Sequence, residues 1–118
     1  MSTTNSSETR PWGSFHVLFD GDCKIKRLVV HPNKRLSLQS HEHRREVWLV
    51  IHGAGHAVVG DEVREIKEGS LIVIEKGQKH RLIHDGSSEQ NLEIIEIQTG
   101  TYFGEDDIVR YEDDFDRV

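Results

Sequence analysis

The feature that most constrains the fold is the close spacing of turn residues, which divide the chain into short apolar runs. Within the runs, apolar and polar side chains alternate, as in half-buried strands, and no long helical period is present. Turns that contain glycine separate the runs, for example at 20–22, 60–62 and 68–70. The pattern predicts an all-β chain, and closing it into a barrel would remove exposed edges.

The strands expected from this pattern lie at 15–19, 23–30, 36–43, 46–52, 55–59, 63–67, 71–75, 79–84 and 91–98. The acidic stretch 104–118 is expected to begin with a helical turn at 105–108 and then to run irregularly.

Size and charge limit the classes of function. A chain of 118 residues suits one domain, which we place at 10–118, after a polar segment at 1–9 that is expected to be disordered. The net charge is -6, with 21 acidic and 15 basic residues and no basic cluster, so nucleic acid is not an expected partner. A small phosphorylated ligand needs only a few local cations and stays compatible.

Cysteine content and hydropathy bear on the compartment. Cys23 is the only cysteine, which suits a reducing environment and excludes a thiolate-rich metal site. No apolar run approaches the about 18 residues of a membrane span, and the first residues lack the apolar segment of a secretory signal. We therefore expect a cytoplasmic protein without a membrane partner.

The segment 36–43 contains the first candidate metal ligands. Successive side chains of a strand point to opposite faces, so Gln39, His41 and His43 share one face. Glu46 has the wrong parity for the same straight strand, and a bulge or turn at residues 44–45 would restore it. The spacing therefore predicts a pair of imidazoles and a carboxylate at one site.

His80 is the fourth candidate, because Gly77 allows a tight turn just before this histidine enters the barrel. Imidazoles with a carboxylate suit zinc, iron, manganese, nickel or copper, and the residues do not choose among them. We expect the remaining histidines to be solvated: His16, His31, His52, His56 and His84.

Two segments resemble the motifs of the cupin superfamily. Residues 31–53 are similar to the first motif, with its HxH, glutamate and closing glycine, and residues 69–84 to the second. The resemblance implies a double-stranded β-helix, or jelly-roll, barrel. Glu75 stands where proline is usual, and His84 stands where asparagine is usual.

Longer blocks resemble one family more closely, the cupin domain of type II mannose-6-phosphate isomerases. They are RPWGSF at 10–15, KIKRLVVHP at 24–32, LSLQSHEHRREVW at 36–48, HRL at 80–82, IEIQTGTYFGEDDIVR at 95–110 and the ending DDFDR. Three places depart from the family. Val47 stands in place of a common histidine, residues 53–55 read Gly-Ala-Gly where Gly-Thr-Ala is usual, and Phe115 begins Phe-Asp-Arg where Tyr-Gly-Arg is preferred. The guanylyltransferase domain of bifunctional members has no counterpart here, so sugar-nucleotide synthesis is not expected of these residues.

The resemblance implies a metal-dependent isomerase that interconverts mannose 6-phosphate and fructose 6-phosphate. The metal ligands would be His41, His43, Glu46 and His80, with Gln39 as a substitute by analogy with single-function isomerases, and zinc is the first expectation. A small phosphorylated sugar would be the ligand, and two copies would pair as a homodimer.

Cationic side chains are the candidates for binding phosphate or an enediolate. Arg110, from GEDDIVR, is the first choice for a catalytic and substrate-binding role, since guanidinium pairs bidentately with such groups. Lys26 shares parity with inward residues and is the second catalytic candidate, and Arg44 and Arg81 are further substrate-binding candidates. The general base is not identified, and Glu96 and Glu105 are the nearest carboxylates.

Two other functions stay open at this stage. A cupin can keep its fold and metal and act as a non-catalytic sugar-binding module. Two histidines and a carboxylate also resemble the facial triad of non-haem iron dioxygenases. The GEDDIVR block favours the isomerase over the dioxygenase, and one barrel supports many functions.

Overall fold

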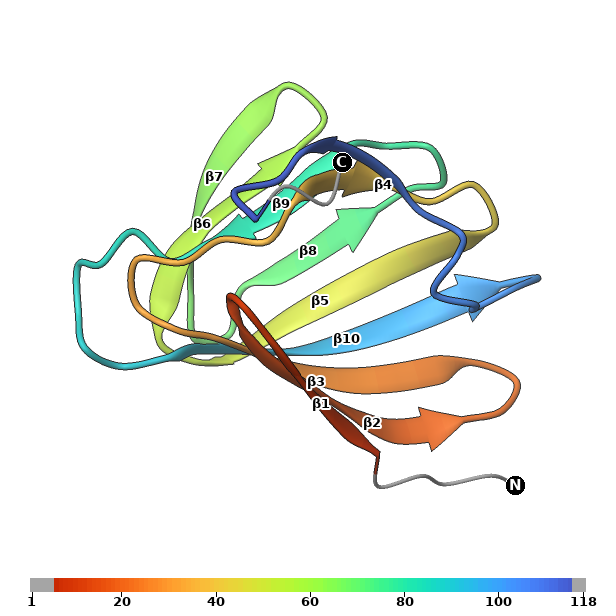
Figure 1. Cartoon of the computed structure of the whole chain (residues 1–118), viewed down its shortest axis with the longest axis horizontal. Helices are drawn as coiled ribbons and strands as arrows, with labels where there is room; N and C mark the ends of the chain where they lie inside the picture. The colour runs from red at the N-terminus through yellow and green to blue at the C-terminus, as the bar shows by residue number, and fades with distance from the viewer. Residues whose placement is uncertain (1–5, 116–118) are drawn as a thin grey trace.

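In the computed structural model, which describes residues 6–115, the chain forms two antiparallel sheets that face each other (Figure 1). The order is β1-β2-β3-β10-β5-β8 in the 6-stranded sheet and β11-β4-β9-β6-β7 in the 5-stranded sheet. The strands are β1 Ser7–Arg10, β2 Gly13–Asp20, β3 Lys24–Val30, β4 Leu38–Ser40, β5 Arg44–His52, β6 Ala54–Val59, β7 Glu62–Lys67, β8 Leu71–Ile74, β9 His80–Ile83, β10 Leu92–Gly100 and β11 Val109–Glu112. This is the all-β jelly-roll barrel that the sequence predicts.

The core lies between the inner faces of the two sheets. On β5, Trp48 and Val50 are buried and face inward, whereas Leu49 between them is 39% exposed. Leu82 on β9 and Ile94 on β10 are fully buried and meet the core from opposite sheets. Burial of these alternating apolar side chains is the main force that holds the sheets together.

The first strand corrects one expectation. Ser7–Arg10 pair with β2 in a hairpin, from Ser7↔His16 to Arg10↔Gly13, so the disorder expected up to residue 9 is wrong for this part. The backbone ladder needs no apolar side chains, and the Ser7 hydroxyl supplies a 2.7 Å hydrogen bond to His16. Ser6 accepts a 2.8 Å hydrogen bond from Val17 N–H, and residues 1–5 lie outside the described residues.

The C-terminal stretch also differs from its expected form. A turn closes at 104–107 with a 3.1 Å hydrogen bond from Asp107 N–H to the Gly104 carbonyl, instead of a helical turn. Strand β11 follows and pairs with β4, where Arg110 faces Gln39 in register. The domain was expected to extend to residue 118, but residues 116–118 lie outside the described part.

Gly100 shapes the region between β10 and β5. It pairs with Arg44, and its φ of 143° lies in a region that residues with a side chain rarely adopt. A Cβ at this position would lie 2.3 Å from the His43 carbonyl oxygen. The glycine thus allows β10 to pass against the turn that begins β5.

No helix among residues 6–115 is long and apolar enough to cross a membrane.

Core packing makes a first prediction. Leu82→Ala should lower the free energy of unfolding by about 2–5 kcal/mol, because it removes fully buried methyl groups and leaves a cavity. Leu71→Ala is the matched control: this side chain is 64% exposed, and the change should stay within about 0.5 kcal/mol. Urea denaturation followed by tryptophan fluorescence measures both, and equal effects would contradict the assignment of the core.

Candidate metal centre and adjoining cavity

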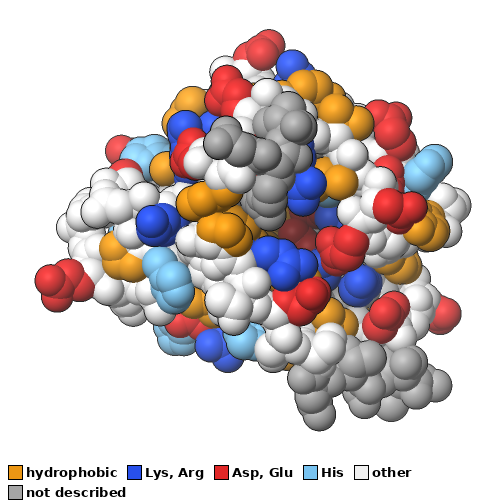
Figure 2. Space-filling model, in the orientation of Figure 1, with side chains coloured by type: hydrophobic (Ala, Val, Ile, Leu, Met, Phe, Trp, Pro, Cys, Tyr) orange, Lys and Arg blue, Asp and Glu red, His pale blue; other side chains and the backbone are white. Residues whose placement is uncertain are grey.

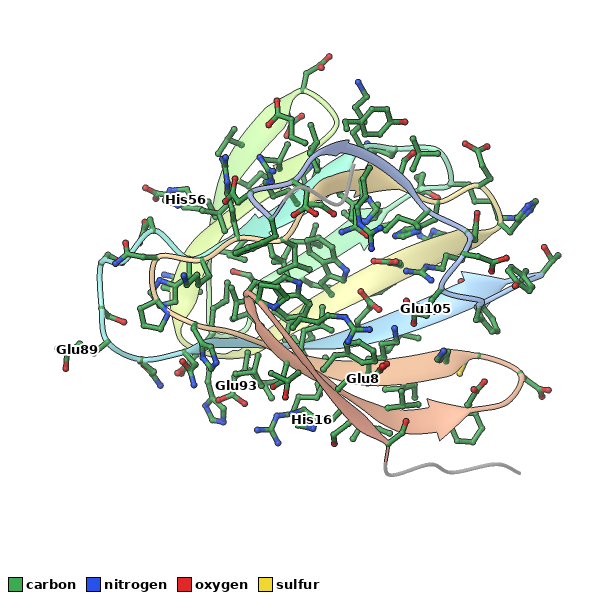
Figure 3. The ribbon with its side chains drawn as sticks, in the orientation of Figure 1. Glu8, His16, His56, Glu89, Glu93 and Glu105 are labelled. Carbon is green, nitrogen blue, oxygen red and sulfur yellow. The ribbon has the colours of Figure 1, made fainter. Side chains whose placement is uncertain are left out.

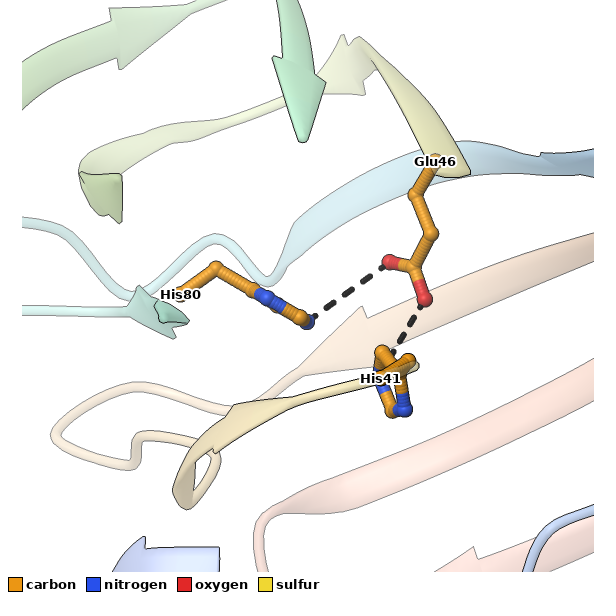
Figure 4. Close-up of side chains that lie close together, drawn as sticks. All are labelled: His41, Glu46 and His80. Atoms are coloured by element: carbon orange, nitrogen blue, oxygen red, sulfur yellow. Dashed lines mark ion pairs between the residues drawn. The ribbon is translucent and has the colours of Figure 1, made fainter. Parts of the chain in front are cut away.

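His41, Glu46 and His80 come together inside the barrel (Figure 4). His41 follows β4, Glu46 lies on β5 and His80 begins β9, so each sheet contributes to the cluster. His41 Nε2 lies 3.3 Å from Glu46 Oε2, and His80 Nε2 lies 3.8 Å from Glu46 Oε1. All three side chains are buried, so the cluster is held in place by the packing of the barrel and is not a chance proximity of mobile surface side chains.

The backbone sets the orientation of both imidazoles. His41 Nδ1 lies 2.6 Å from the Asp107 carbonyl oxygen, and His80 Nδ1 lies 2.9 Å from the Gln78 carbonyl oxygen. A carbonyl only accepts, so each Nδ1 carries the hydrogen, and each ring in its neutral form offers the lone pair of Nε2 to the centre. Burial, and then the charges of Arg44 and His80, lower the pKa of His41 to about 4.

This donor set fits a divalent metal ion. Two Nε2 atoms and a carboxylate are ligands that zinc and its first-row neighbours accept, and hydrogen bonds from Nδ1 to carbonyls are the usual support of histidine ligands. His41, Glu46 and His80 are therefore the residues that would hold the ion.

Glu46 is the centre of the cluster's hydrogen bonds. Arg44 Nε donates to Oε2 at 2.8 Å, and Trp48 Nε1 donates to Oε1 at 2.9 Å. Burial opposes ionisation of Glu46, but its electrostatic interactions with His80 and Arg44 outweigh the effect of burial and hold its pKa below the usual range. The site therefore contains a buried, ionised carboxylate.

His43 does not join this cluster, in contrast to its expected role as a ligand. β4 ends at Ser40 and β5 begins at Arg44, so the strand alternation is interrupted at residues 41–43. His43 is exposed, and its ring lies nearly perpendicular to the Tyr102 ring with the two ring centroids 6.3 Å apart. Because the irregularity comes before residue 44 and not at 44–45, Arg44 takes the inward position that the straight-strand pattern assigned to His43.

A cavity of about 130 Å³ adjoins the cluster, and its lining includes Arg44 and Glu96, which both interact with Glu46. Its charged and polar lining also includes Arg10, Lys26, Gln39, Glu105 and Arg110. Figure 2 shows a hollow near the centre of this face with blue and red side chains gathered around it. Figure 3 shows Glu105, which lines the cavity, well apart from His16 and His56.

Two of the cations expected at the site, Lys26 and Arg110, line the cavity, and they differ in their partners. Lys26 is buried, as its parity predicts, and forms an ion pair with Glu105. Arg110 lies opposite Gln39, and its buried Nε has no hydrogen-bond partner in the described part of the chain. Gln39 donates a 3.0 Å hydrogen bond to the Ser37 hydroxyl and is not part of the cluster of three candidate ligands.

Glu96 is the second buried carboxyl group of the site. Burial, and then the negative charge of Glu46, raise its pKa to about 7, although Lys26 and Arg44 act in the opposite direction. Gln98 donates to Glu96 Oε1 at 2.5 Å, and the Glu96 carboxyl hydrogen-bonds to Glu46. The arrangement lets the two carboxyl groups share one proton.

Arg81 was expected to bind substrate. It is buried, but it does not line the cavity. Neighbouring residues of a strand point to opposite faces, so Arg81 leaves the face that His80 occupies. It donates to the Leu36 carbonyl at 2.8 Å and to Glu112 through both terminal nitrogens, at 3.1 and 3.2 Å. Its guanidinium therefore joins β9 to β11.

His84, expected to be solvated, is a buried structural residue. It donates from Nε2 to the Gln90 carbonyl at 2.7 Å and accepts from Gly86 N–H at 3.0 Å.

Asp107 is a residue that the sequence reasoning did not single out. Its carboxylate accepts hydrogen bonds from the amides of Glu42 and His43, both at 3.0 Å, and its carbonyl orients His41. Burial opposes ionisation, but these two amides hold the pKa of Asp107 below its usual value. The aspartates within GEDDIVR carried a signal only as part of the family block.

The position of His43 makes a second prediction. His80→Ala should abolish stoichiometric zinc binding, because it removes one of the clustered nitrogen ligands, whereas His43→Ala should retain it. Equilibrium dialysis followed by elemental analysis measures the bound zinc, with circular dichroism as the control for folding. Loss of zinc from both variants would support the ligand set expected from the sequence, in which His43 is a ligand.

Curated relatives match almost the whole chain. The chain is 44% identical over 110 residues to the xanthan biosynthesis protein XanB of Xanthomonas campestris pv. campestris, covering 92% of this chain and 23% of the relative. It is 42% identical over 118 residues to the alginate biosynthesis protein AlgA of Pseudomonas aeruginosa, covering 98% and 24%. A mannose-1-phosphate guanylyltransferase of Sinorhizobium fredii is 42% identical over 106 residues, covering 89% and 20%. The chain thus spans about a quarter of the length of these relatives or less.

Solved structures show the same fold at low identity. CapF, a capsular polysaccharide assembling protein of Staphylococcus aureus, aligns with a TM-score of 0.79 at 16% identity, over 94% of this chain and 35% of that one. A cupin-2 domain from Rhodospirillum rubrum aligns with a TM-score of 0.66 at 22% identity, over 80% and 67%. These similarities establish the cupin barrel.

The family model for the C-terminal region of mannose-6-phosphate isomerase matches residues 2–113. The match extends from the N-terminal hairpin to β11 and includes every residue of the cluster and the cavity. The chain belongs to the mannose-6-phosphate isomerase C-terminal family of cupin domains.

Proposed function

We propose that this domain is a metal-dependent isomerase that interconverts mannose 6-phosphate and fructose 6-phosphate. The observation that carries the proposal is the juxtaposition of His41, Glu46 and His80 with a cavity that contains cationic side chains. Family membership supports the choice of substrate.

Aldose–ketose isomerisation moves a proton between C1 and C2 of an open-chain sugar, and negative charge develops on oxygen. A divalent ion, zinc first among the candidates, would supply Lewis-acid stabilisation of that charge when bound. Glu96 and Glu105 line the cavity and are the carboxyl groups available to take the proton from one carbon and return it to the other. The enclosed position of Glu96 excludes bulk water from this exchange.

The cations of the cavity are suited to the phosphate group. The unpartnered Nε of Arg110 is a donor that a phosphate oxygen would satisfy, and Lys26 adds a positive charge from β3. Arg110 is therefore proposed to bind the phosphate or the enediolate, and Lys26 to assist it.

The proposal is tested by incubating metal-loaded protein with mannose 6-phosphate and measuring fructose 6-phosphate, with a chelated sample as the control. Turnover that depends on the metal is the expected result. Absence of turnover, with metal shown to be bound, would refute the isomerase and favour a non-catalytic sugar-binding module.

Arg110 allows a quantitative prediction. Arg110→Ala should lower kcat/KM about 10- to 100-fold, the effect of losing a hydrogen bond to a charged group, while the metal content stays unchanged. Arg64→Ala is the matched control, since Arg64 is an exposed residue of β7 that pairs with Glu62. Unchanged turnover in the Arg110 variant would remove this residue from the mechanism.

A further inference from the structure

Arg44 lies between the candidate metal site and the cavity. Its Nη2 lies 3.1 Å from His41 Nε2, and its Nε donates to Glu46 Oε2 at 2.8 Å. The remaining terminal nitrogen, Nη1, is buried without a hydrogen-bond partner among the described residues, and Arg44 also lines the cavity. The guanidinium thus contacts two candidate metal ligands while one donor is unsatisfied.

The contact with His41 and metal ligation exclude each other. His41 Nδ1 carries the hydrogen that faces the Asp107 carbonyl, so Nε2 has a single lone pair. That lone pair either accepts the hydrogen bond from Arg44 or ligates a metal ion. Glu46 is under no such restriction, because each carboxylate oxygen has a second lone pair. Arg44 must therefore release His41 before the cluster can bind a metal.

The electrostatics of the cavity define where the released guanidinium can go. Besides Glu46, the carboxylates whose charges favour the cationic form of Arg44 are Glu96 and Glu105, and both line the cavity. Turning toward them adds a positive charge beside Lys26 and Arg110. It also brings the unsatisfied donor into a space where an anion can accept its hydrogen bond.

We propose that Arg44 is an exchangeable cation that couples the metal site to the anion site. Without metal, Arg44 hydrogen-bonds to His41 and Glu46. With metal, it faces the cavity and helps to bind a tetrahedral dianion. Metal and anion then bind with positive cooperativity, and each raises the affinity for the other by the same factor. This inference rests on the proposed function for the metal and the phosphate, and adds a coupling between the two sites.

The test uses Co²⁺ as the metal and sulfate as a soluble dianion. Co²⁺ affinity is measured from its visible absorption on metal-free wild-type protein, with and without sulfate at constant ionic strength, and sulfate affinity is measured by calorimetry with and without Co²⁺. We expect sulfate to tighten Co²⁺ binding by a factor between about 5 and 150, and Co²⁺ to tighten sulfate binding equally. No effect of either ligand on the other would overturn the proposal, as would failure to bind Co²⁺.

Variants of two adjacent arginines assign the coupling. Arg44→Met should bind Co²⁺ about tenfold more tightly than wild type without sulfate, because no hydrogen bond competes for His41, and should lose the sulfate effect. Arg45→Met is the matched control, since Arg45 forms an exposed ion pair with Glu75 and should behave as wild type. A sulfate effect that persists in Arg44→Met, or weaker Co²⁺ binding by it, would overturn the assignment.

Two further measurements keep the outcomes separate. If Arg44→Met does not fold, the wild-type titrations still decide, and Arg44→Lys, which keeps the charge but lacks the planar fork, should show a reduced sulfate effect. Isomerase turnover without metal–sulfate coupling would refute the exchange by Arg44 alone. Coupling without turnover would support the exchange and refute the isomerase.

Discussion

The burial of the Glu46 carboxylate is the constraint on which the rest of the site depends. A charge at 1% exposure is costly unless donors and opposite charges surround it. Arg44 and Trp48 donate to its two oxygens, and His41 and His80 face it from separate segments of the chain. The strand β5 therefore carries a buried charge inside the barrel, and the neighbouring strands must bring complementary groups to it.

The loop at 101–108 connects this centre to the mouth of the barrel. Asp107 holds the turn at 42–43 through its carboxylate and orients His41 through its carbonyl, while Glu105 pairs with the buried Lys26. One short segment thus fixes a candidate ligand and neutralises a cation of the cavity. This double role gives a physical reason for the presence of GEDDIVR as a block in a chain of this family.

Family membership and the local geometry support each other at different levels. The match over residues 2–113 covers the region that forms the barrel, whereas the curated relatives are several times longer than this chain. The activities named for those relatives therefore belong to larger proteins. The proposed chemistry of this domain rests on the cluster and the adjoining cavity.

The sequence by itself determined the barrel, most strand positions and the inward orientation of His41, Glu46, His80 and Lys26, because alternation and turn residues are local properties. Only the tertiary structure decided that His43 turns outward and Arg44 inward, since the interruption at 41–43 depends on β10 and Asp107, far away in the sequence. The tertiary structure also decided the position of Arg81, because its partner Glu112 lies on β11. It likewise decided that β1 is a strand, because polar residues form the backbone ladder with β2 and show no apolar alternation. Long-range contacts set these positions, and a local pattern does not contain them.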